Sequence, residues 1–204
     1  MLATVSSATL VGVEGRPVSV EVHVTRGLPS FSIVGLPDAS CRESRDRVRA
    51  AILSSGLKWP QQRVTVNLAP SSVRKGGAGL DLPIAVALLV ADRQVPESSV
   101  AGVAFLGELG LDGSLRKVPG MLPLVHALAA RIVVVPPTSA AEAQLVRGSD
   151  VRCANDLQLL IAVLRGALQS FFEPFSIRAP QSRVGSYFKQ ECLGIEFLLR
   201  ELLV

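Results

Sequence analysis

Aromatic side chains are scarce in this chain of 204 residues, where they make up only 4% of the sequence. Valine, leucine, isoleucine and alanine must therefore fill the core. With 49% hydrophobic and 19% charged residues, the composition is typical of a globular chain and excludes a largely disordered one. The length suffices for one well-packed domain with an appendage.

Cysteines are also few, and they lie far apart. Cys41, Cys153 and Cys192 are an odd number and form no Cys-x-x-Cys pair. This predicts reduced thiols of a cytoplasmic protein, packed as small hydrophobic side chains. Only His23 and His126 could join them as metal ligands, and no ligand spacing is present. We therefore expect no metal site in this chain.

Targeting segments are missing as well. The opening stretch MLATVSSATLVGVEG has no charged beginning and no convincing cleavage site, so we expect no secretory signal peptide. A membrane-spanning helix needs about 20 apolar residues. The apolar stretch of residues 118–137 is interrupted by His126, Arg131 and several prolines. The expected location is the cytoplasm, with no membrane partner.

Strand patterns come first along the chain, and strands alternate with helices after them. Residues 18–25 alternate valine with polar residues, which predicts a half-buried strand with His23 on its solvent face. Further strands are predicted over residues 4–13, 30–35, 63–70, 103–110, 131–137 and 151–153. This order is typical of an α/β domain with a mixed sheet, which we place over residues 1–165.

Helix signals lie between these strands. The first predicted helix begins at Asp38, which can cap it, with Ser40 and Glu43 spaced as a capping box one turn further on. Gly56 ends this helix. Further helices are predicted over residues 82–90, 121–130, 139–146 and 154–165. The helix over residues 82–90 is apolar nearly all round, which predicts that it is buried.

Basic residues form a stripe on the first helix. Arg42, Arg45 and Arg49 follow one another at i, i+3 and i+7, with Glu43 and Asp46 among them. The stripe is either a solvated helix face with local ion pairs or a surface for nucleic acid or a partner protein. The net charge of +4 and the pI of about 9.3 permit a DNA partner without requiring one.

A glycine-rich stretch, PSSVRKGGAGLDLPIAVALL over residues 70–89, is the most informative segment. A phosphate-binding loop needs GxxxxGK[ST], and no GK[ST] occurs anywhere in the chain. The glycines do not match GxGxxG either. We therefore expect no ATP site, and no other cofactor site, in this chain.

A turn that feeds a buried helix fits the same stretch better. Gly76, Gly77 and Gly79 allow positive φ or a close approach of the backbone. Asp81 can cap the following helix, and Pro83 then falls in its first turn. The sequence predicts a strand, a tight turn and a buried helix in succession.

The basic pair before these glycines is predicted to stay at the surface. Arg74 and Lys75 would then be available for contact with DNA or with another subunit. Together with the arginine stripe they complete the candidate binding surface, which comprises Arg42, Arg45, Arg49, Arg74 and Lys75.

The layout of residues 70–136, with GELGLDGSLRKVPG at its centre, is similar to the peptidase domain of Lon proteases. That resemblance places the family's catalytic serine position on Gly79 and its catalytic lysine position on Leu122, so both functional groups are missing. Other hydroxyls and amines lie nearby in sequence, at Ser71, Ser72, Ser114, Lys75 and Lys117. None of them occupies a matching position, and a displaced Ser-Lys dyad remains an alternative.

Three longer blocks more closely resemble the magnesium-chelatase-like ComM/YifB family of AAA+ proteins, in its N-terminal ChlI-type domain. The blocks are FSIVGLPDASCRESRDRVRAAI, VTVNLAPSSVRKGGAGLDLPIA and GELGLDGSLRKVPG. The resemblance covers residues 1–165 and implies a fold like domain 2 of ribosomal protein S5. It also implies a longer protein whose AAA+ module uses ATP and Mg²⁺, assembles as a hexamer and, in ComM, acts on branched DNA during natural transformation.

The composition changes abruptly after Gly166. Six of the nine aromatic residues lie in residues 166–204, where no family resemblance continues and no AAA+ motif follows. We place a boundary there and expect residues 166–204 to be an aberrant tail from a frameshifted or truncated reading frame.

The leading hypothesis is a non-catalytic accessory domain without its motor, which contacts DNA or takes part in ring assembly. The alternatives are a Lon-like peptidase with a displaced dyad and an inactive remnant whose tail exposes apolar surface.

Overall fold

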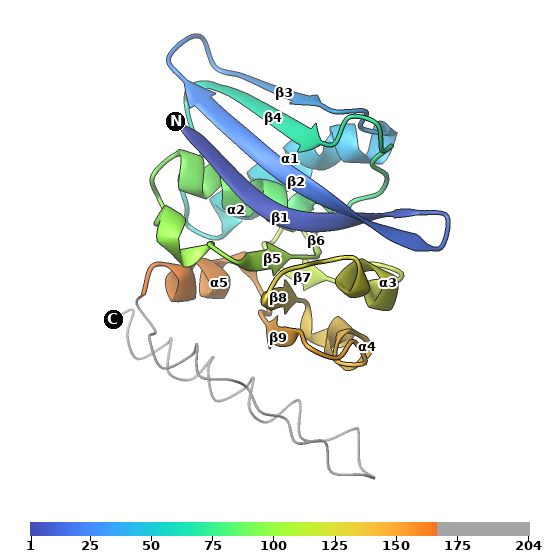
Figure 1. The fold of residues 1–204 in the computed structure, drawn as a ribbon. Helices are drawn as coiled ribbons and strands as arrows, with labels where there is room; N and C mark the ends of the chain where they lie inside the picture. The colour runs from blue at the N-terminus through green and yellow to red at the C-terminus, as the bar shows by residue number, and fades with distance from the viewer. Residues whose placement is uncertain (167–204) are drawn as a thin grey trace. The chain divides into compact units, whose positions relative to one another are not determined.

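A computed structural model gives the architecture and describes residues 1–166 (Figure 1). A long hairpin of β1 and β2 opens the chain, followed by β3, helix α1, strand β4 and helix α2. Their bounds are Leu2–Val11 (β1), Glu14–Thr25 (β2), Ser30–Val34 (β3), Ala39–Ser54 (α1), Arg63–Ala69 (β4) and Asp81–Ala91 (α2). This half contains the glycine-rich stretch and the arginine stripe.

The second half alternates short strands and helices. Its elements are η1 (Glu97–Ser99), β5 (Val103–Phe105), β6 (Glu108–Leu109), β7 (Leu115–Arg116), α3 (Met121–His126), β8 (Ile132–Val135), η2 (Pro137–Ser139), α4 (Ala140–Ala143), β9 (Asp150–Cys153) and α5 (Leu157–Leu164).

One seven-stranded sheet has the order β3-β4-β2-β1-β5-β8-β9, and β6 and β7 form a separate two-stranded sheet. Strands β4, β2 and β1 pair antiparallel, whereas β3 pairs with β4, and β1, β5, β8 and β9 pair with one another, in parallel. The predicted α/β class with a mixed sheet is confirmed. The likeness to ribosomal protein S5 domain 2 stays a prediction.

Two hydrophobic clusters form on opposite faces of the sheet. Strand β1 contributes Val5 to the larger cluster and Ala8 to the smaller one, because successive residues of a strand face opposite sides. Helix α2 lies in the larger cluster, against β1 and β2, and every one of its residues is buried. Its apolar sequence therefore predicted its position correctly.

Two expected elements differ from the structure. The strand predicted over residues 103–110 is two strands, because the chain leaves the main sheet after Phe105 and Glu108–Leu109 pairs with β7 instead. The helix predicted over residues 121–130 ends at His126. There the N–H of Leu128 turns back to the carbonyl of Val125 and tightens the last turn.

Of the side chains singled out in the sequence, two have the predicted exposure and one does not. His23 is exposed on β2 as predicted, and Cys41 is buried as predicted. Cys153 is exposed, so its prediction as a buried hydrophobe is wrong: it is the last residue of β9, where the edge of the sheet meets solvent. Cys192 and the expected aromatic tail lie outside the described residues.

The described residues show neither a membrane-spanning helix nor a cluster of metal-binding side chains. No helix within residues 1–166 is long and apolar enough to cross a membrane. The same residues contain no group of three or more His, Cys, Asp or Glu side chains placed to hold a metal ion.

Candidate functional site

The segment from Pro70 to Leu80, here called the glycine loop, connects β4 to α2 and is bonded to other segments around Lys75. The N–H of Lys75 donates to the carbonyl oxygen of Leu36 at 3.2 Å, and the N–H of Asp38 donates to the carbonyl oxygen of Lys75 at 2.9 Å. The N–H of Gly76 reaches Thr9 Oγ1 at 3.5 Å. The loop therefore lies against the residues that lead into α1.

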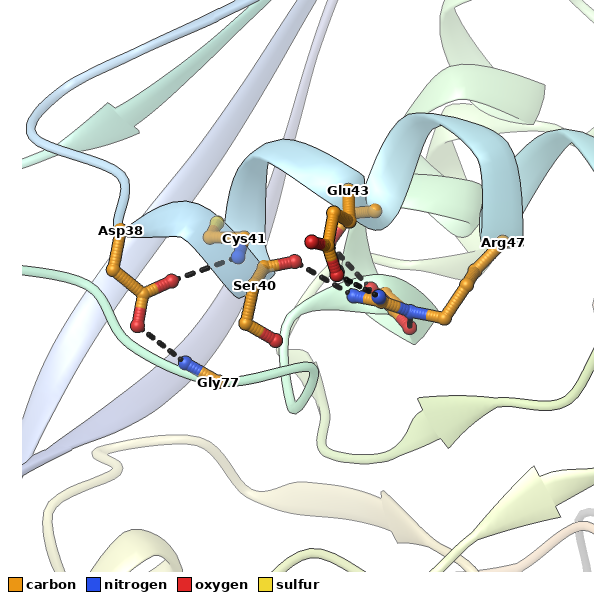
Figure 2. Close-up of polar contacts among 8 residues, drawn as sticks. Asp38, Ser40, Cys41, Glu43, Arg47 and Gly77 are labelled. Atoms are coloured by element: carbon orange, nitrogen blue, oxygen red, sulfur yellow. Dashed lines mark hydrogen bonds and ion pairs between the residues drawn. The ribbon is translucent and has the colours of Figure 1, made fainter.

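Asp38 joins the glycine loop to the start of α1 (Figure 2). Its Oδ1 accepts from the N–H of Cys41 at 2.7 Å, and its Oδ2 accepts from the N–H of Gly77 at 3.1 Å. The predicted helix cap at Asp38 is confirmed. The predicted capping box of Ser40 and Glu43 is wrong, because α1 has already begun at Ala39 and Asp38 supplies the cap.

The glycines of the loop are required by different constraints. Gly77 has φ +78°, which only glycine adopts without strain. A Cβ on Gly76 would lie 3.0 Å from Asp38 Oδ2. A Cβ on Gly79 would lie 2.8 Å from Val118 Cγ1. The predicted turn is confirmed, and Gly79 is needed for close packing.

Lys75 is not at the surface, contrary to the prediction. Its side chain is fully buried, and its Nζ donates to the carbonyl oxygen of Pro70. Burial lowers the pKa of the Lys75 ammonium, because the charged form loses its hydration. The neighbouring Arg74 is exposed as predicted. The prediction failed because the segment around Lys75 runs beside Leu36–Asp38, a contact that the local sequence does not reveal.

Asp81 is not the cap of α2, again contrary to the prediction. It is the first residue of the helix, and the cap position falls on Leu80, which makes no side-chain bond there. The Asp81 carboxylate is fully buried and accepts bonds from Ser44 Oγ, from Arg47 Nε at 2.7 Å and from Arg47 Nη2 at 3.1 Å. These partners lie on α1, so the carboxylate joins two helices.

The ionisation of this pair follows from its burial. Burial raises the pKa of the Asp81 carboxyl, and the bonds from Arg47 and Ser44 oppose part of that rise. The same contact raises the pKa of the Arg47 guanidinium, which stays charged. Arg47 also donates to Ser40 O at 2.9 Å and lies 3.6 Å from Glu43 Oε2. Arg47 thus holds the first two turns of α1 against α2 (Figure 2).

Arg47 is the residue that the sequence analysis missed. The arginine stripe drew attention to the outer face of α1, whereas Arg47 lies three residues after the buried Ser44. A polar residue on the inner face of a helix was the available signal, since a buried polar side chain implies a partner.

The exposed basic residues are spread along the surface. Arg45 and Arg49 are exposed on α1, and Arg74 is exposed on the glycine loop. Within residues 1–166 the structure records no ion pair for any of these three. Arg42 lies in the first turn of α1, about 10 Å along the helix axis from Arg49 at 1.5 Å per residue. Lys75 is thus removed from the predicted surface, Arg45, Arg49 and Arg74 are exposed, and the binding role of these arginines stays a prediction.

The Lon-like catalytic positions hold no reactive group. Gly79 packs beneath Val118, and Leu122 is a partly exposed residue of α3. The nearby polar groups have other partners: Ser114 Oγ donates to Asp112 Oδ1 at 2.7 Å, and Lys117 Nζ lies 3.5 Å from Glu142 Oε2.

The amine of Lys75 also has another partner, because it donates to the carbonyl oxygen of Pro70. No bond between a serine hydroxyl and a lysine amine is recorded among the described residues, so none of these groups is arranged as a dyad.

Comparison with known proteins agrees with this picture. The sequence model of the family described as subunit ChlI of Mg-chelatase matches residues 20–139. YifB of Salmonella typhimurium is 42% identical over 167 residues, which cover 81% of this chain and 33% of YifB. Rv2897c of Mycobacterium tuberculosis is 43% identical over 79% of this chain and 33% of its own length. The competence protein ComM of Haemophilus influenzae is 38% identical, with coverages of 81% and 33%.

The matched region takes in α1, the glycine loop, α2 and the ion pair between Arg47 and the buried Asp81, so the chain belongs to the ChlI family. Within this family it corresponds to the N-terminal ChlI-type domain of the ComM/YifB proteins. It spans about a third of the length of the curated relatives it matches.

Proposed function

We propose that this domain is a non-catalytic accessory domain of a ComM/YifB-type protein and that it contacts DNA through the outer face of α1 and the glycine loop. The observation that carries the proposal is the set of exposed guanidinium groups, Arg45, Arg49 and Arg74, for which the described residues offer no ion pair.

The absence of reactive groups at the Lon-like positions supports a binding role. A nucleophile at position 79 would have to displace Val118, whose Cγ1 lies 2.8 Å from the point where a Cβ would stand. Position 122 is occupied by leucine, which cannot act as a base. Peptidase chemistry has no groups to use at these two positions.

Charge supports DNA as the partner. A guanidinium without a protein carboxylate can bind phosphate oxygens and release their counterions. Helix α1 extends over 16 residues and carries Arg45 and Arg49 one turn apart, so both can follow one phosphate backbone. A role in DNA processing during competence follows by analogy with the relative named competence protein ComM.

ATP hydrolysis, Mg²⁺ binding and hexamer formation belong, in this proposal, to the parts of the longer relatives that this chain does not match. The chain contains no GxxxxGK[ST] segment of its own. The domain would therefore supply DNA contacts to a motor located elsewhere in such a protein.

Salt dependence of binding tests the proposal. Fluorescence anisotropy of the full chain with a labelled duplex and a labelled four-way junction should show affinity falling steeply between 50 and 200 mM salt. The double variant Arg45→Ala, Arg49→Ala should weaken binding about tenfold and lower the slope of log K against log salt by about 2, since each phosphate contact contributes about 0.9.

The matched control is Arg16→Ala, which removes an exposed arginine that Glu14 pairs at 2.6 Å. It should leave the affinity nearly unchanged. Equal affinity at the two salt concentrations, or an equal loss in the control, contradicts the proposal.

A further inference from the structure

The two edges of the main sheet are protected differently. Strand β9 carries Asp150 and Arg152, which form an ion pair at 2.6 Å. Strand β3 forms the other edge and lies in GLPSFSIVGLP, residues 27–37, which contains no charged residue. Natural sheets commonly protect open edges with charges, so an uncharged edge favours pairing with another strand.

The free backbone groups of β3 can be assigned from its register. Ser30 donates its N–H to Gln62 O, and β3 then runs parallel to β4 from Ser30 to Val34. Backbone groups of alternate residues point to opposite sides of a strand. The N–H and C=O groups of Phe31 and Ile33 therefore point to the open edge.

An exposed leucine lies just outside each end of this edge strand. The tripeptide Gly-Leu-Pro occurs on both sides of β3, and its leucines, Leu28 and Leu36, are 84% and 57% exposed. Both lie four residues from Ser32. Leu36 also has φ +57°, a conformation that leucine seldom adopts. Gly35 also has positive φ, at +95°, so the chain turns out of the strand after Val34 and leaves most of the Leu36 side chain in solvent.

We propose that β3 pairs antiparallel with β3 of a second copy of this chain, about a two-fold axis at Ser32. An antiparallel pair centred there places Phe31 opposite the second copy's Ile33, and Ser30 opposite the second copy's Val34. The same strand supplies both sides of this pairing, so the interface is self-complementary, as a two-fold axis requires. The lack of charge means that no residue of the edge meets its own charge across the axis.

The proposed register satisfies the free backbone groups. Phe31 and Ile33 form hydrogen-bonded pairs across the axis, and the Ser32 pair between them is not hydrogen-bonded, with Cα atoms about 4.5 Å apart. Pro29 and Pro37 have no N–H and limit the edge at its two ends. On the inner face, Phe31 already packs on Trp59 with ring centroids 5.6 Å apart, so pairing extends the existing core.

Disulfide cross-linking of the full chain tests this register. In a Cys153→Ser, Cys192→Ser background, Ser32→Cys should form a cross-linked dimer rapidly under mild oxidation, because the two Cα atoms lie within disulfide range. Ser30→Cys is the matched control on the same strand face. In the proposed register its copies are offset by four residues, roughly 13 Å, and should not cross-link.

Sedimentation velocity of the unmodified chain tests the dimer itself. Wild type should show a concentration-dependent dimer, and Ser32→Lys should raise its dissociation constant at least about tenfold by placing like charges face to face. Ser149→Lys, next to β9, should leave it unchanged. Circular dichroism confirms that both variants fold.

A monomer at all concentrations, a dimer that resists Ser32→Lys, or equal cross-linking of Ser30→Cys and Ser32→Cys overturns the proposal. None of these outcomes depends on DNA binding, so they leave the proposed function to its own experiment.

Discussion

Helix α1 carries arginines in two different environments. Arg47 lies on the side that faces α2 and binds the buried Asp81 carboxylate, whereas Arg45 and Arg49 point to solvent without a recorded ion pair within residues 1–166. The glycine loop repeats the contrast in adjacent residues, since Arg74 is exposed and Lys75 is buried. A basic side chain therefore indicates a binding surface only after its burial is known.

The contrast also separates two energetic roles. A buried charge has lost its hydration and depends on its partner, so removing either member leaves the other uncompensated. An exposed charge keeps its hydration and contributes little to stability. The inner basic residues should therefore govern folding, and the outer ones should govern binding.

Arg47→Ala should produce the largest effect, because it leaves the Asp81 carboxylate buried without its cation. We expect a loss of about 3–5 kcal/mol in the free energy of unfolding. Arg45→Ala on the same helix should remain within about 0.5 kcal/mol of wild type. Urea unfolding, followed by the fluorescence of Trp59, the one tryptophan of the chain, measures both.

The double variant Arg47→Met, Asp81→Leu is the control for this pair. It removes both charges while keeping apolar volume, so it should recover most of the loss. A loss in Arg45→Ala as large as that in Arg47→Ala would remove the distinction between the inner and outer residues.

Lys75→Ala should have the next largest effect, since it removes a fully buried side chain and its bond to Pro70 O. Cavity formation and the lost bond together predict about 2–3 kcal/mol of destabilisation. Arg74→Ala, one residue earlier, should be nearly neutral. Thermal or urea unfolding of the two variants measures the two losses of stability. Equal losses would contradict the assignment of Lys75 to the interior and of Arg74 to the surface.

Alkaline pH should change the free energy of unfolding by a smaller amount, through two buried groups, Cys41 and Lys75, whose contributions have opposite signs. Burial, with the nearby Asp38 and Asp81 carboxylates, raises the pKa of the Cys41 thiol to about 11 from an ordinary 9.0. The folded state then keeps a proton that the unfolded state loses, so stability falls as pH rises from 9 towards 11. Lys75 has a lowered pKa, so its contribution makes stability rise as pH approaches 10.5.

Two variants separate these contributions between pH 8 and 11. Cys41→Ala should gain stability relative to wild type as pH rises, by up to about 2 kcal/mol. Lys75→Met should lose stability relative to wild type over the same range. Urea unfolding at each pH measures both differences, and differences that do not vary with pH would show that neither group titrates differently in the folded state.

Local patterns predicted the elements whose causes are local. The valine alternation of β2, the apolar run of α2 and the cap at Asp38 each depend on neighbours within a few residues, and the structure confirms them. Gly56 likewise follows the end of α1 with φ +70°, as its position predicted.

The predictions that failed concern residues whose partners lie far away in the sequence. Asp81 fits a helix cap by local rules, yet its partner Arg47 lies 34 residues away. Lys75 fits a surface position by its charge, yet Leu36 and Asp38 bond to its backbone from a separate segment. The sequence therefore predicted the exposed arginines and missed the contact of Arg47 with the buried Asp81, because long-range partners cannot be read from a short window of sequence.

The carboxylate of Asp38 has one further consequence. It accepts one bond from the first turn of α1 and one from Gly77 in the glycine loop, so the two segments share one anchoring side chain. The two segments should open as one cooperative unit and exchange their amide hydrogens together. A molecule that binds the glycine loop would then change the motions of α1, the helix that carries Arg45 and Arg49.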